Sequence, residues 1–344
     1  MKILSLIVPA YNSAAFLPKC LDSFLCSDVL EELDVVVVDD GSADETARIA
    51  QSYCRKYPAS FRLIRQENRG HGGALNTGSA AAVGKYLKVI DADDWVISEN
   101  LPEFVEFLKG SSADVVLTDY QTLDICTGEV RNWRSFPGEA GKAYTLAQIM
   151  GRWKDFDRCL TFHGIAYRTE FYHRFGIRLS ERVFYEDHEF AAFPCCRAEG
   201  IAVRNLTVYV YRIGDKQQSV SPENQLKRQH HTRQVLQRMA TEYRAQAPCL
   251  TAAGREYVSR KTAGLLLGYL ITALLGNPDR GQGRRDARAF MVYFRGNFPG
   301  TAELVQRQYG ILRILNRMGV SKACFDRFLR SRVYNLLRGN RNFD

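Results

Sequence analysis

Three carboxylates lie almost side by side in the segment Asp91-Ala92-Asp93-Asp94 of this chain. They directly follow the apolar run 86–90, which predicts a buried strand. Neighbouring negative charges raise one another's pKa unless a positive group lies near them. Mg²⁺ or Mn²⁺ would supply that positive charge, because both ions bind carboxylate oxygens together with diphosphate oxygens. The segment therefore predicts a divalent-metal site, and the alternative is a solvated acidic turn before the next helix.

A second acidic pair, Asp39-Asp40, is followed by Gly41-Ser42 and closes the β-branched run 34–38. A carboxylate in this position can accept hydrogen bonds from a nucleotide base or from a ribose hydroxyl. The alternative is a purely structural turn, in which Ser42 and Glu45 form the capping box of a helix that begins at Ser42. The residue types alone leave both interpretations open.

A third carboxylate suited to chemistry is Asp187, which follows Glu186 and begins an expected helix over residues 187–197. The partial positive charge of a helix N-terminus keeps an adjacent carboxylate in its ionised, basic form. A hydroxyl group is a poor nucleophile until such a base takes its proton. The alternative role for Asp187 is an N-cap, which would only satisfy backbone amides of the helix.

The elements that must position these carboxylates alternate between strand and helix over the first 120 residues. The expected strands and helices follow from apolar runs and from apolar residues at helical spacing: strands over 4–8, 34–38, 62–65, 86–90 and 115–118, and helices over 13–26, from 42 onward and over 72–83. This order predicts an α/β fold with a mostly parallel sheet and helices on both faces. Because ligands bind such sheets beyond the carboxyl ends of the strands, residues 9–12, 39–42 and 91–94 are expected to share one site.

The pattern changes after residue 120. Residues 121–220 are mixed, and the chain is expected to be helical from about residue 222. We therefore expect an α/β domain over residues 1–220, followed by an all-helical region over 221–344. Within the mixed part, the apolar runs predict strands over 201–204 and 208–212.

Cysteine usage and hydropathy predict a cytoplasmic protein. The nine cysteines form no C-x-x-C pair, and an odd number cannot all pair, so reduced thiols are expected. The N-terminal apolar run stops at Pro9 and is too short for a signal sequence. The apolar stretch 263–276 would span about 21 Å as a helix, too short for a bilayer, so we expect a buried helix and no transmembrane anchor.

The formal charge of +9 lies entirely in the C-terminal part of the chain. Residues 281–344 contain 13 basic and four acidic residues, whereas residues 1–280 contain 34 of each. A nucleic-acid binder is therefore not expected, because the basic charge does not cover the α/β domain. Basic residues interleaved with apolar ones are typical of helices that bind anionic membranes, so one hypothesis is peripheral binding of 281–344 to the inner face of such a membrane. The alternative is a solvated basic face packed on the rest of the protein.

Two common phosphate-binding motifs are excluded by their spacing. A dinucleotide fingerprint G-x-G-x-x-G should directly follow the first strand, where the chain reads Pro9-Ala10-Tyr11-Asn12. The later Gly70-His71-Gly72-Gly73 lacks the third glycine in register, and Gly84-Lys85 lies too far from Gly78 for a P-loop. A nucleotide ligand would therefore have to be held by other groups.

In their order and spacing, these motifs resemble those of family 2 glycosyltransferases, which have the GT-A fold. The resemblance covers about residues 1–120 through the segments Val8-Pro9-Ala10-Tyr11-Asn12, Val38-Asp39-Asp40-Gly41-Ser42, Glu67-Asn68-Arg69-Gly70 with Asn76-Thr77-Gly78, Gly84-Lys85-Tyr86 and Asp91-Ala92-Asp93-Asp94. It continues more loosely through Tyr185-Glu186-Asp187 and residues 209–221. Five ordered motifs are far more specific than any one of them.

The resemblance implies an inverting enzyme that moves a sugar from a nucleoside diphosphate sugar, expected to be a UDP-sugar, to a hydroxyl of a glycan or lipid-linked acceptor. It implies a GT-A-type Rossmann-like sheet with a nucleotide-binding half over 1–120 and an acceptor half over 121–220. It implies that Pro9, Tyr11 and Asp40 frame the base and that Asn12 belongs to the nucleotide site. It implies that Asp91 contacts the ribose. It also implies that Asp93 binds Mn²⁺ or Mg²⁺ and that Asp187 takes the proton of the acceptor hydroxyl.

Other polar residues near the expected cleft stay ambiguous. Arg69, His71 and Lys88 could meet a diphosphate as cations, but each taken alone is interpreted as a surface charge. His163 and His188 are equally open. The acceptor is expected to be a cell-surface polysaccharide or related glycan, by analogy only.

Two other functions compete with the glycosyltransferase as interpretations of this sequence. A nucleotidylyltransferase should have a glycine-rich turn with an arginine after the first strand, and residues 9–15 contain neither. A non-catalytic sugar-nucleotide-binding or scaffold module would have no need for Asp91, Asp93 and Asp187 together. The sequence therefore favours the enzyme.

Overall fold

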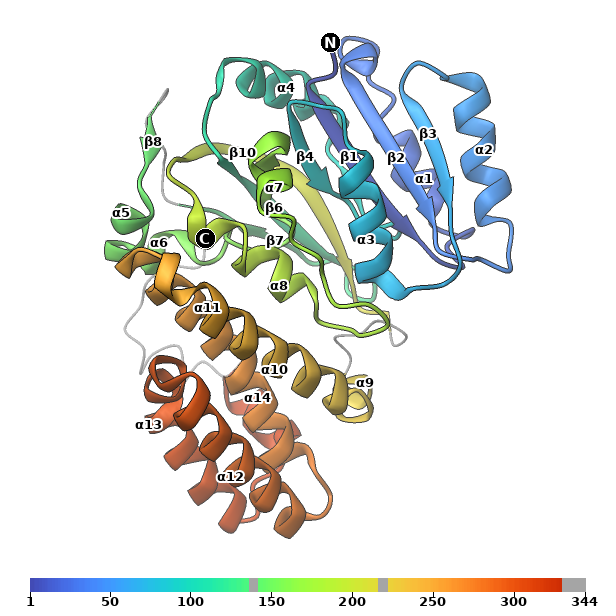
Figure 1. The fold of residues 1–344 in the computed structure, drawn as a ribbon. Helices are drawn as coiled ribbons and strands as arrows, with labels where there is room; N and C mark the ends of the chain where they lie inside the picture. The colour runs from blue at the N-terminus through green and yellow to red at the C-terminus, as the bar shows by residue number, and fades with distance from the viewer. Residues whose placement is uncertain (136–141, 216–221, 330–344) are drawn as a thin grey trace. The chain divides into compact units, whose positions relative to one another are not determined.

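The computed structural model describes residues 1–135, 142–215 and 222–329, and the chain divides into two compact units (Figure 1). Unit 1 comprises Met1–Gln218 and Leu250–Tyr257, and unit 2 comprises Ser219–Cys249 and Val258–Asp344. Unit 1 has the predicted α/β fold, and the described part of unit 2 is helical, so both predictions of fold class are confirmed. The boundaries at residues 120 and 220 stay predictions.

Unit 1 is built on one ten-stranded sheet. Eight of its strands follow the order β3-β2-β1-β4-β9-β6-β10-β5, β7 pairs with β6, and β8 pairs with β10. The strands are β1 Leu4–Ala10, β2 Leu33–Asp39, β3 Phe61–Arg65, β4 Tyr86–Val89, β5 Trp95–Val96, β6 Val115–Asp124, β7 Val130–Trp133, β8 Ala143–Tyr144, β9 Ile165–Arg168 and β10 Ile201–Ile213. The helices are α1 Leu17–Asp22, α2 Thr46–Lys56, α3 Gly70–Ala81, α4 Leu101–Gly110, α5 Leu146–Gly151, α6 Trp153–Phe156, α7 Thr169–Arg174 and α8 Asp187–Ala192.

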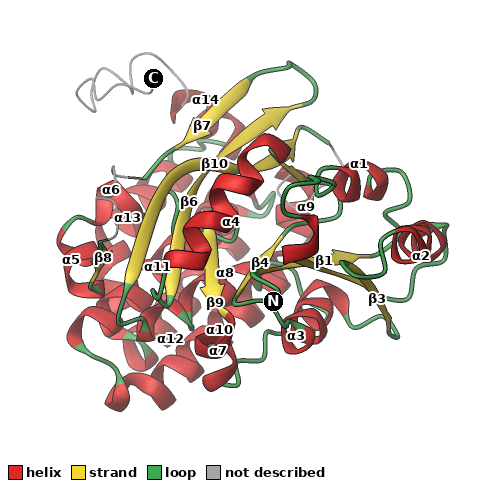
Figure 2. Cartoon of the chain, turned by 90° about the horizontal axis from the view of Figure 1, so that it is seen from above, coloured by secondary structure: helices red, strands yellow, loops and turns green. Residues whose placement is uncertain are grey.

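The parallel arrangement expected for the first 120 residues is confirmed for β3, β2, β1 and β4, which pair in parallel in that order. Beyond β4 the sheet is mixed, because β9 pairs antiparallel with both β4 and β6. Strand β10 pairs in parallel with β6, and helix α4 packs against β10 (Figure 2).

Helices cover both faces of the parallel strands. Leu4, Leu6 and Val8 of β1 point to one face and join a buried cluster with side chains of α1 and α4. Ile7 points to the other face, where α3 lies so close that a Cβ atom at Gly78 would be 2.3 Å from Ile7 Cγ2 (Figure 1). The alternation of side chains along a strand thus gives one apolar strand two buried faces.

The predicted capping box at Ser42 is wrong. Helix α2 begins four residues later, at Thr46, and its N-cap residue Glu45 makes no side-chain capping bond. The Asp44 carboxylate instead accepts a hydrogen bond from the Thr46 amide at 3.0 Å. Residues 42–45 therefore form a loop, and the Ser42 hydroxyl accepts a hydrogen bond from the Asn12 amide at 3.0 Å.

Three expected elements have different lengths in the structure. The helix expected over 187–197 begins at Asp187 as predicted but ends at Ala192, and a 3-10 turn follows over Cys195–Arg197. The strands expected over 201–204 and 208–212 are one strand, β10, with irregular pairing between Arg204 and Tyr209. The helix expected over 13–26 covers only Leu17–Asp22. In each case the apolar pattern identified the element but not its ends.

Glycines at the start of α3 allow the chain before α8 to pack directly on this helix. A Cβ atom at Gly72 would lie 2.1 Å from the backbone oxygen of Ser180 and 2.9 Å from Glu186 Cγ. Gly70 has a φ of +76°, and the Arg182 amide nearby donates a hydrogen bond to the Arg69 carbonyl at 2.8 Å. The glycines therefore set the position of Glu186 and of Asp187, the next residue.

We expect Gly72→Ala to lower the free energy of unfolding by about 1–3 kcal/mol, because the added methyl group displaces backbone rather than a flexible side chain. Thermal unfolding measures this effect. Gly110→Ala at the end of α4 is the matched control, since a Cβ atom there meets nothing within 4 Å. Equal melting temperatures of the two variants would contradict the close approach at Gly72.

Unit 2 consists of helices in its described part: α9 Pro222–Lys227, α10 Gln229–Gln246, α11 Ala252–Ile271, whose first residues belong to unit 1, α12 Arg280–Asn297, α13 Pro299–Arg317 and α14 Lys322–Leu329. The apolar stretch 263–276, which we expect to form a buried helix, corresponds to the end of α11 and the π-helical turn Thr272–Gly276 that continues it. Among the described helices, this one (Ala252–Gly276) is long and apolar enough to cross a membrane by length and composition, and 67% of its apolar window is buried. The last residues of the basic tail, 330–344, lie outside the described residues.

Candidate active site

The carboxyl ends of three parallel strands bring the predicted segments to one edge of the sheet. Strand β1 pairs in parallel with β2 and with β4, with Ala10 opposite Asp39 and Ile7 opposite Val89. Residues 11–12, 39–40 and 91–94 therefore follow the strands at the same edge. This juxtaposition is the one expected from the strand order.

The loop after β1 combines an exposed ring with a structural link. Tyr11 is 53% exposed, so its ring is available for stacking, whereas Pro9 is buried in β1 opposite Val38. Asn12 has a φ of +48°, and its side-chain oxygen accepts a hydrogen bond from the Ala43 amide at 2.9 Å. The Asn12 side chain thus ties the loop after β1 to the loop after β2.

The two carboxylates after β2 are buried and hydrogen-bonded. Asp40 Oδ1 accepts hydrogen bonds from Gln66 Nε2 at 2.6 Å and from the Arg69 amide at 2.8 Å. Asp39 accepts from the Ser42 amide at 3.1 Å and from Arg65 Nε at 3.3 Å. Both bonds to Asp40 go to Oδ1, and among the described residues Oδ2 accepts no further hydrogen bond.

Asp91, Asp93 and Asp94 each offer a carboxylate oxygen within 4.8 Å of the others, the spacing of a metal site. Asp94 is buried, and its oxygens accept hydrogen bonds from the Tyr209 hydroxyl at 2.5 Å and from the Arg212 amide at 2.7 Å. Burial and the charges of Asp91 and Asp93 raise the pKa of Asp94 well above its usual range. Asp94 therefore anchors β10 to this loop, and Asp91 and Asp93 are the partly exposed members of the cluster.

Oxygen donors at this spacing fit a hard divalent cation such as Mg²⁺ or Mn²⁺. Burial is the main cause of the raised pKa of Asp94, and the like charges of Asp91 and Asp93 raise it further. Asp93 is the ligand that the sequence predicted, and its side chain is 34% exposed. Arg212 lies 3.8 Å from Asp93 Oδ2 and stacks over the Phe16 ring at 4.5 Å, and its guanidinium is also paired with Asp215 at 3.0 Å.

His71 connects this cluster to the Glu-Asp pair before α8. Its Nε2 lies 2.9 Å from Asp91 Oδ1, and its Nδ1 lies 2.5 Å from Glu186 Oε1. Only the doubly protonated imidazolium can donate to both carboxylates at once. Burial alone would lower the pKa of His71, but the two carboxylates outweigh it and raise this pKa well above 6.5. The interpretation of His71 as a surface charge is therefore wrong.

Asp187 is the first residue of α8 and directly follows Glu186, the carboxylate bonded to His71. Its side chain is half-buried, whereas Glu186 is only 2% exposed, and burial raises the pKa of Glu186. Tyr185, which precedes them, has a φ of +76°, a conformation that a bulky side chain rarely adopts. Such backbone conformations concentrate at functional sites. Sequence reasoning singled out Asp187 as a candidate but not Tyr185, whose unusual backbone conformation lies two residues before it.

Two basic residues near the cleft are enclosed rather than on the surface. Lys88 is fully buried in β4 and donates hydrogen bonds to the backbone oxygens of His163 at 2.6 Å and Ile165 at 3.3 Å. Burial lowers the pKa of Lys88 to about 7. The interpretation of Lys88 as a surface charge is therefore wrong. The His163 ring stacks on Tyr211 at 4.3 Å, and burial lowers the pKa of His163 to about 4.

Because His163 is buried and has a lowered pKa, we expect the folded protein to lose stability at acidic pH. The unfolded chain binds a proton on this residue below about pH 6.5, whereas the folded chain binds it only below about pH 4. Stability is therefore lost as the pH falls from 6.5 toward 4, by roughly 2–3 kcal/mol at pH 4.5. We expect His163→Phe, which keeps a ring in the stack, to lose less unfolding free energy between pH 7 and pH 4.5 than the wild type in urea titrations. Parallel losses in both proteins would contradict this assignment.

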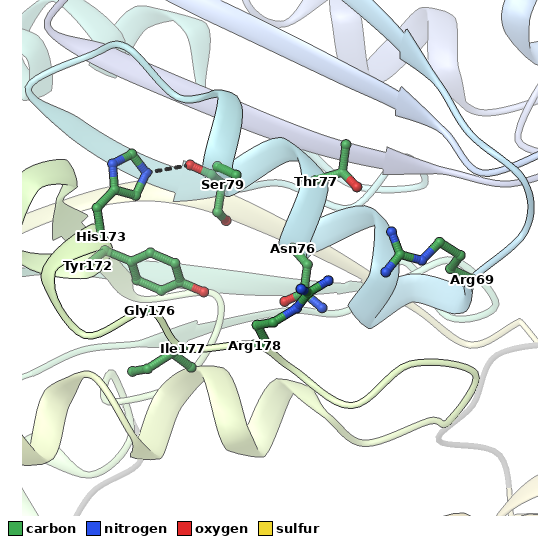
Figure 3. A pocket seen from close by; sticks show the side chains of 10 residues that line it. Arg69, Asn76, Thr77, Ser79, Tyr172, His173, Gly176, Ile177 and Arg178 are labelled. Carbon is green, nitrogen blue, oxygen red and sulfur yellow. Dashed lines mark hydrogen bonds between the residues drawn. The ribbon is translucent and has the colours of Figure 1, made fainter.

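A pocket of about 460 Å³ lies on the other side of α3, between this helix and the chain around α7 (Figure 3). Arg69, Asn76, Tyr172 and Arg178 are among its lining residues, and none of the lining residues is Asp91, Asp93 or Asp187. Both arginines lie near the Glu181 carboxylate, Arg69 in a two-point ion pair and Arg178 at 3.8 Å. The positive charge of this pocket is therefore partly compensated.

Comparison with known proteins identifies one family. Residues 5–173 match the family described as glycosyl transferase family 2. The uncharacterized glycosyltransferase EpsJ of Bacillus subtilis (strain 168) is 28% identical over 214 residues, which are 61% of each chain. Chondroitin synthase of Escherichia coli is 30% identical over 155 residues, 45% of this chain and 22% of the synthase. The matches thus span less than two thirds of these relatives.

Solved structures share the fold at lower identity. The crystal structure of S. aureus TarS 1–349 has a TM-score of 0.62 and 19% identity, covering 93% of this chain and 92% of that one. The same TarS fragment in complex with UDP-GlcNAc has a TM-score of 0.54. The mannosyltransferase PcManGT from Pyrobaculum calidifontis, in complex with GDP-Man and Mn²⁺, has a TM-score of 0.50 and 19% identity, with 91% and 86% coverage. These similarities show the GT-A fold.

Proposed function

Because this chain is a family 2 glycosyltransferase, matched over residues 5–173, we propose that it transfers a sugar from a nucleoside diphosphate sugar to a hydroxyl group with inversion at the anomeric carbon. The proposed acceptor is a glycan or a lipid-linked glycan. A uridine diphosphate sugar is the proposed donor, supported by the UDP-GlcNAc complex of a protein with this fold. The GDP-Man complex of another makes guanosine donors the first alternative.

The observation that supports this proposal most is the His71 bridge. It connects Asp91, in the acidic cluster at the sheet edge, with Glu186, the neighbour of Asp187 in the chain. A transferase needs groups that hold the leaving diphosphate and a base for the attacking hydroxyl within one site. The two acidic segments are about 95 residues apart in the sequence, and one imidazolium holds them together.

We propose the following roles for the donor site. Tyr11 stacks on the base, Pro9 and Asn12 shape the loop around it, and Asp40 accepts a base N–H through Oδ2. Asp91 binds the ribose through the oxygen that His71 does not engage. Asp93, with Asp91, would hold Mn²⁺ or Mg²⁺, and such an ion stabilises negative charge on a diphosphate leaving group. The Arg212 guanidinium beside Asp93 adds positive charge for the same diphosphate.

Asp187 is the proposed base that takes the proton of the acceptor hydroxyl. Its place at the first turn of α8 favours the ionised carboxylate, because the helix N-terminus is partly positive. Glu186 is a weaker candidate, since it is buried and already bonded to His71. We further propose that the reaction takes place on the cytosolic side of a membrane, in the synthesis of a cell-surface polysaccharide.

Binding and turnover of defined donors test the proposal. Thermal shifts with UDP-, GDP- and dTDP-sugars in the presence of Mn²⁺ are expected to show stabilisation by one nucleotide class. The stabilising donor should then be hydrolysed slowly without acceptor, and the free nucleoside diphosphate measured by chromatography. Binding without any hydrolysis would favour the scaffold module, and release of pyrophosphate from a nucleoside triphosphate and a sugar phosphate would favour the nucleotidylyltransferase. Failure of every donor to bind would overturn the proposal.

A further inference from the structure

A groove of about 650 Å³ in unit 2 is lined by arginines of α12 and α13, which pack side by side (Figure 1). Five guanidinium groups line it: Arg284, Arg285, Arg288, Arg295 and Arg313. The first four lie on one exposed face of α12, because residues three, four, seven and eleven apart point the same way. The groove therefore concentrates positive charge on a solvent-facing side of the helix pair.

The charges of this groove are not matched by carboxylates among the described residues. Arg284 donates to Asn316 Oδ1 at 2.7 Å and Arg295 to Gln306 Oε1 at 2.9 Å, so both partners are neutral amides. Arg313 stacks on the Tyr309 ring at 5.6 Å. The Asp279 carboxylate lies 4.0 Å from Arg285 and also interacts electrostatically with Arg284, so it offsets about one of the five charges.

The pocket on unit 1 provides the contrast, because there both arginines lie near one glutamate, Glu181. Like-charged guanidinium groups held together with neutral partners favour an anion between them. Residues 281–329 carry nine basic and three acidic residues, so the excess extends over this whole part of unit 2. The groove on α12 and α13, unlike the pocket on α3, fits phosphate groups.

The exposed side of α13 also carries a stripe of apolar residues. Leu304, Ile311, Ile314 and Met318 are 42–71% exposed, and their spacing of seven, three and four residues keeps them on one face. The opposite face of α13 is buried through Val305, Tyr309 and Leu312. Val292, one of the residues lining the arginine groove, is 58% exposed as well. Apolar side chains at this spacing that the described residues leave exposed indicate a surface that meets an apolar phase.

We propose that the exposed surface of α12 and α13 binds a bilayer of anionic phospholipids. The arginine groove holds lipid phosphates, and the stripe Leu304, Ile311, Ile314 and Met318 enters the boundary between headgroups and acyl chains. A soluble polyanion would use the arginines but not the apolar stripe, and therefore fits the surface less well. This inference concerns where the protein binds and does not depend on its donor chemistry.

Flotation with vesicles tests the proposal on the full chain. Wild-type protein is expected to float with vesicles of phosphatidylcholine and phosphatidylglycerol but not with phosphatidylcholine alone. Each basic residue near an anionic surface contributes roughly a factor of five to binding, so Arg288→Gln with Arg295→Gln and Arg313→Gln should weaken it about 100-fold. The pair Ile311→Ser and Ile314→Ser should weaken it about tenfold through lost apolar burial. All five positions are exposed, so the melting temperature should not change.

A matched control removes the same charge from unit 1. The substitutions Arg48→Gln, Arg55→Gln and Arg131→Gln affect exposed side chains outside unit 2 and should leave flotation unchanged. The proposal is overturned if wild-type protein does not float with the anionic vesicles, or if the control variant loses as much binding as the groove variant. It is also overturned if soluble polyphosphate binds the groove while the Ile311→Ser, Ile314→Ser variant floats like the wild type. Donor thermal shifts of the same variants report separately on the proposed function.

Discussion

Asp187→Asn is expected to slow sugar transfer about 10³-fold while the affinity for the donor stays unchanged. The amide has the same shape as the carboxylate but cannot take the proton of the acceptor hydroxyl, and general-base catalysis typically contributes 10²- to 10⁴-fold. Donor affinity should persist because Asp187 lies in the first turn of α8, whereas the residues proposed for the nucleotide follow β1, β2 and β4. Product formation under saturating donor measures the first quantity, and calorimetric titration with the donor measures the second.

The matched control for Asp187→Asn is Glu186→Gln. Glu186 is buried and bonded to His71, so its substitution should weaken the bridge and lower the melting temperature. We expect it to slow transfer much less than Asp187→Asn, because Glu186 is buried and already bonded to His71 and so cannot reach an acceptor hydroxyl. Full activity of Asp187→Asn combined with an inactive, folded Glu186→Gln would move the role of base to Glu186.

The sequence was sufficient to predict the site residues that lie at the carboxyl ends of the parallel strands. Apolar runs located β1, β2 and β4, and parallel strands present the residues that follow them at one edge of the sheet. Asp39-Asp40 and the 91–94 cluster were therefore predictable from local pattern and order. The same reasoning predicted the helix that begins at Asp187, because apolar spacing and an acidic first turn are local signals.

The partnerships between distant side chains could not be predicted in this way. His71 and Lys88 are both single basic residues in the sequence, yet one bridges two carboxylates and the other is buried against backbone carbonyls. What distinguishes them is the tertiary environment, which sequence spacing does not contain. The capping box predicted at Ser42 is wrong for a related reason, because the Ser42 hydroxyl accepts a hydrogen bond from the Asn12 amide of another loop. The glycines at 70 and 72 were the one available signal, because small residues at the start of a helix permit close approach.

Asp93→Asn is expected to weaken binding of Mn²⁺ in the presence of nucleoside diphosphate by at least about 100-fold and to abolish measurable transfer. Asp93 is partly exposed, and the Arg212 guanidinium lies 3.8 Å from its carboxylate. Loss of one of few carboxylate ligands removes both a bond and a negative charge, and hard cations depend on both. Calorimetric titration with Mn²⁺ measures the affinity independently of turnover. Chelation should inactivate the wild type and have no further effect on this variant.

The Asp94→Asn variant distinguishes metal binding from structural support. Asp94 belongs to the same cluster as Asp93, but its carboxylate accepts hydrogen bonds from the Tyr209 hydroxyl and from the Arg212 amide. The amide substitution replaces one acceptor oxygen with an NH₂ group, which leaves a buried polar group without a partner and costs about 1–3 kcal/mol. We therefore expect a lower melting temperature and nearly unchanged Mn²⁺ affinity for Asp94→Asn, and the reverse for Asp93→Asn. Equal loss of Mn²⁺ affinity in both variants would mean that the ion binds to all three carboxylates, and that Asp94 exchanges its hydrogen bonds with β10 for the metal.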